Sequence, residues 1–212
     1  GSIGIPPYQE LLPAIQSGLE AKAEAILAEF RKQCEAAGIQ PDTKKIVGVI
    51  DEAIVEESQS CCDWVLLAQR GEHFHLGSGA ILGSTAQSVV RRSGKPVLVT
   101  PEKFREITTM ALAYDGSPPA DKALNLAADL ARAAGWPLSI VIVADDEALG
   151  AKQSQKARDI LGPLNIASTA IVRKGKEDRE LLRFIGEGSA DLLVMGAYGH
   201  NRLRELFLGS TT

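Results

Sequence analysis

The apolar residues of the chain follow two periods, one typical of helices and one typical of buried strands. From Tyr8 to Ala37 they recur every three to four positions opposite a polar face, which predicts a long amphipathic helix that ends at Gly38. Short continuous apolar runs predict strands instead. The predicted strands are Lys45–Ile50, Trp64–Ala68, Pro96–Thr100, Thr108–Tyr114, Leu138–Val143, Thr169–Val172 and Leu192–Met195, the last expected to be buried on both faces.

Helical spacing recurs between these strands. The further predicted helices are Ala53–Ser60, Gly83–Arg92, one that begins at Pro118 and Pro119 and closes at Gly135, Leu149–Leu161, and Asp178–Ile185. Because strands alternate with helices, we expect right-handed βαβ units and a mainly parallel sheet. The predicted fold class is therefore α/β, with open parallel sheets flanked by helices.

The chain also contains an internal repeat. The segment CDWVLLAQRG…ILGST, from Cys62, parallels ADLLVMGAYG…FLGST, from Ala190. We therefore expect two tandem copies, residues 1–104 and 105–212. With this offset, the first-copy counterpart of the strand at Thr108 would precede residue 1. The chain is thus expected to lack the opening strand-helix-strand and the closing helix and strand of a tandem protein.

Glycines and hydroxyl residues follow the last predicted strand. Gly196 and Gly199 come soon after it, and after nine intervening residues come Gly209, Ser210 and Thr211. Glycine lets the backbone turn tightly and approach a ligand, and the N–H groups and hydroxyls at a helix start suit phosphate. A simpler reading is also open, in which these are turn glycines and helix N-caps.

The order of strand, G-x-x-G, nine residues and G-S resembles the nucleotide-binding motif of the universal stress protein family. The strand end ALAYDGS, Ala111–Ser117, is similar to the family's first strand, and IVIVAD, Ile140–Asp145, is similar to its second. The resemblance implies a tandem member with a Rossmann-like fold of the adenine nucleotide alpha hydrolase type.

The resemblance also implies a ligand and its contacts. The ligand would be ATP or another adenine nucleotide, with magnesium as a candidate companion ion. Asp115 and Val143 would line the nucleoside, and a carboxylate at this position suits ribose hydroxyls or a magnesium-bound water. Asp115 could equally cap the helix at Pro118. The ribose and phosphates would be held by Gly196, Gly199, Gly209, Ser210 and Thr211.

Some residues depart from the family pattern. Tyr198 is bulky enough to crowd the ligand or stack on it. In the first copy Ala68 replaces the first motif glycine and the spacing to Gly83 is longer. We therefore expect the first copy to be degenerate and to have a structural or partner-facing role.

Composition limits the other functions. The formal net charge is −4 and the basic residues are scattered, so we expect no nucleic-acid partner. No apolar run is long enough to predict a transmembrane helix, so we expect no membrane partner. Three cysteines, two of them adjacent, do not suggest a disulfide framework and favour a cytoplasmic location. His73 and His75 could share one face of a strand, but no further metal ligand is evident.

No catalytic constellation or Walker motif is apparent, so we expect a slow ATPase at most. The function expected from the resemblance is that of an ATP-binding regulatory protein of the stress response. The halves are expected to pack as a pseudo-dimer through PVLVT, with further pairing of chains as a homodimer. Two alternatives remain, a nucleotide-free protein-interaction scaffold of the same fold and a slow ATP-hydrolysing enzyme.

Overall fold

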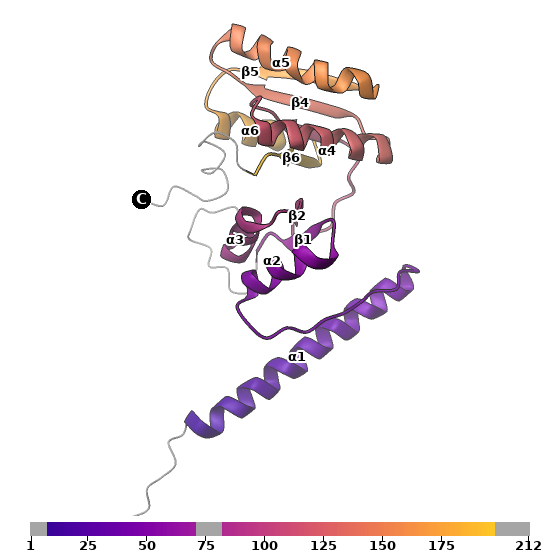
Figure 1. Ribbon diagram of the computed structural model, residues 1–212, viewed down its shortest axis with the longest axis vertical. Coiled ribbons are helices and arrows are strands. Elements are labelled where there is room, and N and C mark those ends of the chain that lie inside the picture. Colours follow the sequence, from indigo (N-terminus) through magenta and orange to yellow (C-terminus); the bar gives the residue numbers. More distant parts are fainter. Residues whose placement is uncertain (1–7, 71–81, 198–212) are drawn as a thin grey trace, which may run out of the picture. The chain divides into compact units, whose positions relative to one another are not determined.

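The computed structural model describes residues 8–70 and 82–197, and the chain divides into two compact units, Gly1–Val49 and Ile50–Thr212 (Figure 1). The predicted boundary between residues 104 and 105 differs from this division. It falls between the two sheets of unit 2, which share no ladder, and it stays a prediction.

The described part of unit 1 consists of the helix α1, Tyr8–Ala36, and the segment that follows it. The predicted long helix is therefore confirmed, and Gly38 follows it with the left-handed φ of 73°. The segment after Gly38 is tied to α1 by polar side chains. Arg31 Nη1 donates to Thr43 Oγ1 at 2.7 Å, and Lys45 Nζ pairs with Glu24 Oε1 at 3.0 Å.

The strand predicted at Lys45–Ile50 is wrong. Residues 45–49 form neither helix nor strand, and Ile50 is the first residue of α2. A strand is stabilised by ladder hydrogen bonds to a neighbour, and the described part of unit 1 contains no other strand. Val47 is consequently 88% exposed despite its apolar side chain.

The first part of unit 2 holds a two-stranded parallel sheet. The strands β1, Val65–Ala68, and β2, Val97–Thr100, pair from Val65↔Val97 to Ala68↔Thr100. Both strands agree with the predicted ones. In the described residues β2 pairs with β1 alone, so pairing of PVLVT across the halves stays a prediction.

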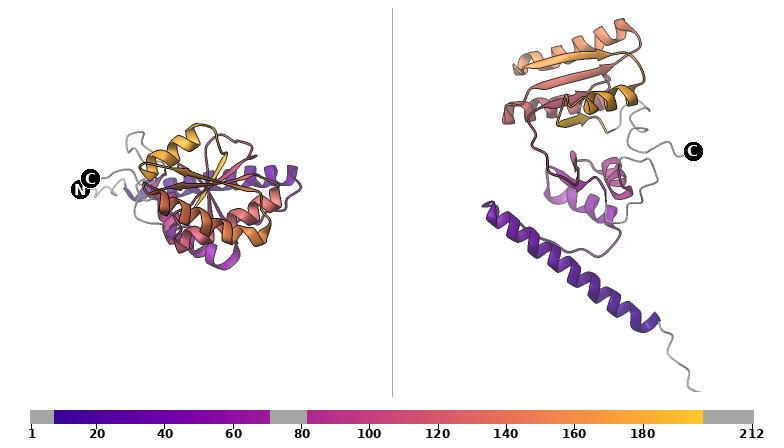
Figure 2. Two further views of the ribbon diagram at one scale, coloured as in Figure 1. Left: turned by 90° about the horizontal axis from the view of Figure 1, so that it is seen from above. Right: turned by 180° about the vertical axis from the view of Figure 1, so that it is seen from behind.

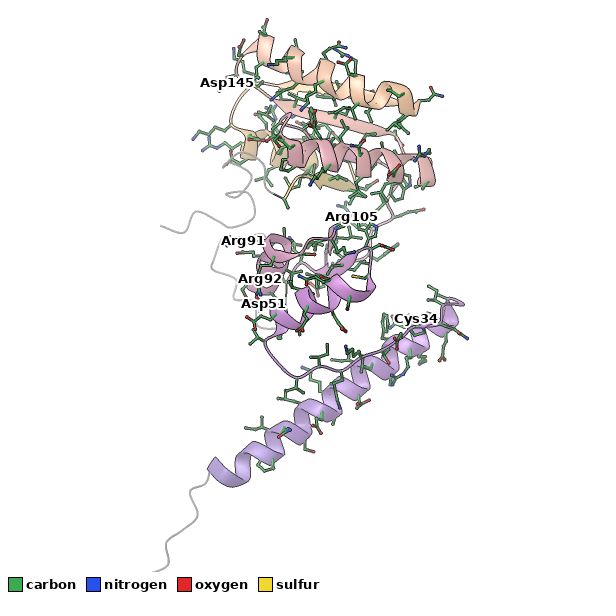
Figure 3. The ribbon with its side chains drawn as sticks, viewed as in Figure 1. Cys34, Asp51, Arg91, Arg92, Arg105 and Asp145 are labelled. Carbon is green, nitrogen blue, oxygen red and sulfur yellow. The ribbon has the colours of Figure 1, made fainter. Side chains whose placement is uncertain are left out.

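Two helices accompany this small sheet, α2, Ile50–Cys61, and α3, Ser84–Arg92. Val55, Val65 and Val89 form its buried core. Asp51 of α2 accepts hydrogen bonds from the Ser88 hydroxyl and, at 3.2 Å, from Arg92 Nη1 of α3 (Figure 3). The two helices are therefore joined by a polar contact as well as by the core.

The second part of unit 2 is a four-stranded sheet in the order β5-β4-β3-β6, with every pair parallel. The mainly parallel α/β architecture is confirmed. The strands are β3, Met110–Ala113, β4, Leu138–Val143, β5, Ser168–Arg173, and β6, Leu192–Met195. The helices are α4, Pro118–Ala134, α5, Glu147–Leu161, and α6, Glu177–Gly186, with a short 3-10 turn, η1, at Gly162–Leu164.

The helices cover both faces of this sheet (Figure 2). On one face, side chains of β3 and β4 pack with α4 and α5. This cluster includes Met110, Leu112, Leu124, Ala127, Ile140, Ile142, Ala157 and Leu161. On the other face, Ala111, Ala113 and Val141 pack with Leu181 and Phe184 of α6. Strand alternation explains the division, because successive side chains point to opposite faces.

The strand β6 differs from its prediction in burial. Leu192 and Val194 pack toward the α4 side, and Leu193 and Met195 toward the α6 side, so both faces make contacts. All four residues are nevertheless only half-buried. The reason is that β6 is the last strand in the described order and has a neighbour on one side only.

Within the described ranges, no helix combines the length and the apolar character needed to cross a bilayer.

Candidate functional site

The carboxyl ends of β3, β4 and β6 meet at one edge of the sheet, because neighbouring parallel strands run in the same direction. Asp115 lies in the loop after β3, Val143 is the last residue of β4, and Gly196 directly follows β6. The structure thus brings these three predicted site residues to the same edge. In α/β sheets this edge is where ligands bind.

At this edge β4 extends farther than β3. The last β3–β4 pair is Ala113↔Val141, whereas the last β4–β5 pair is Val143↔Arg173. Ala144 N then donates to Arg173 O at 2.9 Å. Because successive residues of a strand direct their N–H and C=O groups to opposite sides, those of Val143 point toward the β3 side, beyond its last pair. The backbone of Val143 therefore offers a donor and an acceptor at the edge.

The loop between β3 and α4 has a tight geometry. Gly116 adopts the left-handed φ of 74°, which glycine reaches without strain. Asp115 Oδ1 accepts a hydrogen bond from Ser117 N at 2.9 Å, and Ser117 Oγ accepts one from Ala120 N at 3.3 Å. Ser117 is therefore the N-cap of α4, and the alternative in which Asp115 caps the helix is wrong. A serine hydroxyl at this position binds the amide three residues on.

The first turn of α4 has no amide to spare for a phosphate. Pro118 and Pro119 carry no N–H, Ala120 N donates to Ser117 Oγ, and Asp121 N donates to Ser117 O at 2.9 Å. Anion binding at a helix start requires free N–H groups. The first turn of α4 therefore offers no free backbone N–H group to an anion.

Helix α5 contributes side chains that the sequence analysis missed. Gln153 Nε2 donates to Asp115 O at 2.7 Å, and Lys156 Nζ donates to Gly116 O, also at 2.7 Å. These two residues are three apart and so share one face of the helix. The spacing alone does not reveal that this face meets the loop after β3.

Three side chains next to the same loop, those of Tyr114, Asp121 and Lys156, are joined by hydrogen bonds. Tyr114 Oη donates to Asp121 Oδ1 at 2.6 Å, and Lys156 Nζ bonds Asp121 Oδ2 at 2.7 Å. Burial of Tyr114 and, second, its bond to Asp121 raise the pKa of this phenol well above its ordinary value. The phenol therefore remains protonated and acts as a donor.

Gly196 is buried against the start of α4. A Cβ at this position would lie 2.9 Å from Pro119 C, 3.0 Å from Pro119 Cβ and 3.1 Å from Ala120 N. These distances are too short for a Cβ atom. Packing by itself therefore already requires glycine at this position, whether or not a ligand binds. This close approach brings the end of β6 beside the first turn of α4, which follows the loop that carries Asp115.

The remaining predicted site residues, Gly199, Gly209, Ser210 and Thr211, lie outside the described residues, as do Tyr198, His73 and His75. Among the residues that the structure describes, no group of three or more His, Cys, Asp or Glu side chains could hold a metal ion.

In the first copy, the glycine before α3 is bonded to the residue that follows β1. Gly83 N, just before α3, donates to Gln69 O at 2.8 Å, directly after β1. Gly83 has no room for a ligand on this amide, because the amide already has its acceptor. The expected degeneracy of the first copy stays a prediction.

Comparisons with known proteins give the family. The model of the universal stress protein family matches residues 4–101 and 150–212, in keeping with two copies. The stretch between these ranges holds Asp115 and Val143. The universal stress protein Slr1230 of Synechocystis sp. (strain ATCC 27184 / PCC 6803 / Kazusa) is 32% identical over 225 residues, which cover 100% of this chain and 77% of the relative.

Two solved structures show the same fold. A universal stress protein from Archaeoglobus fulgidus DSM 4304 matches 96% of this chain and 73% of its own, with a TM-score of 0.70 at 23% identity. Protein PA1789 from Pseudomonas aeruginosa PAO1, described as functionally unknown, matches 88% of this chain and 71% of its own, with a TM-score of 0.57 at 16% identity. From the two matched segments and the identity over its full length, the chain belongs to the universal stress protein family.

Proposed function

We propose that the carboxyl edge of the β5-β4-β3-β6 sheet binds an adenine nucleotide, with ATP as the first candidate, and that the protein acts as a regulatory module of the stress response. One observation carries the proposal. β4 extends past β3, so the backbone of Val143 offers a donor and an acceptor beside the loop that holds Asp115. A donor and an acceptor side by side match the hydrogen-bonding edge of adenine.

The described residues take separate roles in this proposal. Val143 reads the base through its backbone, and the carboxylate of Asp115 accepts from ribose hydroxyls. Gly196 lets the chain directly after β6 pass close to the start of α4. The amides of α4 are already used, so the phosphates would be held by the segment that contains Gly199, Gly209, Ser210 and Thr211.

Magnesium would accompany the nucleotide rather than occupy a protein cage. Mg²⁺ is commonly held by substrate phosphates, waters and one or two carboxylates. Asp115 fits that limited role through a water. We therefore expect magnesium to change nucleotide affinity and to bind weakly in the absence of nucleotide.

Titration calorimetry with ATP, with and without magnesium, tests the proposal. We expect heat from the wild type, and weaker binding by Asp115→Asn, which keeps the side-chain shape but removes the charge, and by Gly199→Val. Asp129→Asn is the control, because Asp129 is an exposed α4 carboxylate whose partner is Arg132. Absence of heat from the wild type, or equal binding by Asp115→Asn and Asp129→Asn, would contradict the proposed site.

A nucleotide-free scaffold is the second candidate, and one feature of unit 1 favours it. Large apolar side chains of α1 are exposed in the structure, among them Ile15, Leu19, Ile26 and Phe30. Such exposure is common where a protein surface meets a partner. If the calorimetry gives no nucleotide binding, the scaffold is the remaining candidate of this fold.

We place the protein in the cytoplasm. We expect no enzymatic turnover beyond that of a slow ATPase. Cys34 and Cys62 are both free thiols, in agreement with a reducing compartment. Release of inorganic phosphate from ATP tests the second part. Steady turnover faster than about one per minute would instead place the protein among enzymes, whose turnover numbers are far higher.

A further inference from the structure

We propose that helix α5 sets the geometry of the nucleotide site through Gln153 and Lys156, which act as positioning residues for the loop that carries Asp115. The inference rests on the proposed function, because it concerns the same site. It adds two residues that neither the glycine motif nor the strand ends include.

The two side chains fix two consecutive carbonyl groups. Gln153 Nε2 donates to Asp115 O and Lys156 Nζ donates to Gly116 O, both at 2.7 Å. The peptide unit that contains Gly116 O also contains Ser117 N, which donates to Asp115 Oδ1 at 2.9 Å. The direction of the Asp115 carboxylate therefore depends on backbone orientations that α5 holds in place.

The loop also packs against α5. A Cβ on Gly116 would lie 3.4 Å from Gln153 Cγ, which is ordinary van der Waals contact. With φ at 74°, Gly116 has access to conformations that other residues avoid, so external contacts are needed to select one of them. The side chains of α5 provide these contacts.

Helix α5 is itself held in place by packing against the sheet. Ala157 and Leu161 belong to the buried core, and Gly150 lies so close to β5 that an added Cβ would be 2.8 Å from Val172 Cγ1. A helix that is fixed on the sheet makes a stable reference for a loop. The position of Asp115 is thus tied to the core through α5.

The ammonium group of Lys156 already has two acceptors. It bonds Gly116 O and Asp121 Oδ2, each at 2.7 Å, and Asp121 in turn accepts from Tyr114 Oη. An ammonium held by a carboxylate and a carbonyl positions its partners. We therefore assign Lys156 to the loop and not to the phosphates.

The side-chain oxygen of Gln153 also supports a positioning role for this residue. Within the described residues, Gln153 Oε1 is buried and accepts no hydrogen bond. A buried acceptor without a donor is costly. The amide is therefore best explained by its other end, which donates to the loop.

The test combines two measurements on the full chain, with Lys156→Met and Gln153→Leu as variants. Hydrogen exchange is measured on the peptide that contains residues 113–118, and the affinities for ATP and for adenosine are measured by calorimetry. We expect faster exchange in this peptide and a loss of affinity of roughly tenfold for both ligands. Adenosine is decisive because it lacks phosphates.

Controls and a rescue separate positioning from general destabilisation. Lys152→Met and Gln155→Leu remove the same side chains from exposed positions of α5, where the hydrogen bonds of Gln155 go to Arg158 and Asp159 of the same helix and not, within the described residues, to the loop. We expect both controls to exchange and bind as the wild type does. Lys156→Arg keeps a cation with several donors and should restore slow exchange and affinity in large part.

Each outcome decides the inference. Unchanged exchange at residues 113–118 in both variants overturns it, whatever the nucleotide result. A loss of ATP affinity with unchanged adenosine affinity also overturns it, because Lys156 would then contact phosphate. If the wild type binds neither ligand, the proposed function fails, and exchange in the variants still decides whether α5 sets the loop.

Discussion

Asp191 and Thr109 join the amino ends of two neighbouring strands that are far apart in sequence. Asp191 Oδ2 accepts from both the amide and the hydroxyl of Thr109, at 3.0 and 2.9 Å, and from the corresponding groups of Thr108 at the same distances. These bonds, led by the Thr108 amide, lower the pKa of Asp191 to about 2. This carboxylate therefore holds the start of β6 beside the start of β3, at the edge opposite the candidate site.

Replacing Asp191 by Asn should lower stability in a pH-dependent way. The carboxyl group titrates at about 2 when folded and near 3.8 when unfolded, so its stabilisation is present above pH 4 and is lost as the pH falls toward 2. Urea unfolding midpoints at pH 7 and pH 3 measure this. We expect the wild type and Asp191→Asn to differ more at pH 7 than at pH 3.

Asp129→Asn is the matched control for this change, because it removes an exposed carboxylate from the same unit. We expect its midpoint to stay close to the wild type, since surface ion pairs contribute little. An equal effect of both substitutions would contradict the role given to Asp191.

Replacing Gly196 by Ala should destabilise the protein by about 1–3 kcal/mol through overpacking. The added methyl group would meet the Pro119 backbone at 2.9 Å, where only a shift of α4 or β6 could relieve the contact. Gly162→Ala is the control, because this glycine has helical dihedral angles and no atom within 4 Å of the added Cβ. Chemical denaturation measures both, and equal stability of the two variants would show that Gly196 has more space than the structure gives it.

The same pair of variants bears on the ligand. A shift of β6 away from α4 would also move the chain beyond Gly196, so Gly196→Ala should weaken ATP binding more than Gly162→Ala does. Unchanged affinity in a folded Gly196→Ala variant would restrict this glycine to a packing role.

The sequence predicted the parts of the fold that depend on local patterns. The strands at Leu138–Val143 and Leu192–Met195 have the predicted bounds, because each is a short and predominantly apolar run. The end of α4 at Gly135 was likewise predictable, since that glycine adopts a φ of 71°.

Features that depend on distant partners were not predictable in this way. Lys45–Ile50 has the composition of a strand, but a strand also needs a neighbour, and local composition does not supply one. Ile50 joins α2 instead, where Asp51 and Glu52 suit the positive end of the helix dipole.

The residues of the candidate site likewise differ in whether the sequence indicates them. The resemblance to the universal stress protein family pointed to Asp115, Val143 and Gly196, and the structure brings all three to the carboxyl edge of the sheet. The sequence did not locate Gln153 and Lys156, whose bonds to the loop span 38 and 40 residues. Such pairs become visible only when the packing of α5 on the sheet is known.

Replacing Tyr114 by Phe tests the hydrogen bond between Tyr114 and Asp121, next to the loop that carries Asp115. The hydroxyl donates to Asp121 Oδ1 at 2.6 Å, so its removal should lower the free energy of unfolding by about 1.5 kcal/mol, the usual cost for a bond to a charged group. Because the pKa of Tyr114 is raised, the folded state keeps a proton that the unfolded state loses near pH 10, and wild-type stability should fall as the pH rises above 10. An alkaline titration followed by tyrosinate absorbance should show a late ionisation step in the wild type. Tyr114→Phe should lack this step. Asp121→Asn should retain a late step, since burial is the larger cause of the shift, and ionisation of every tyrosine near pH 10 in folded wild type would refute the buried phenol.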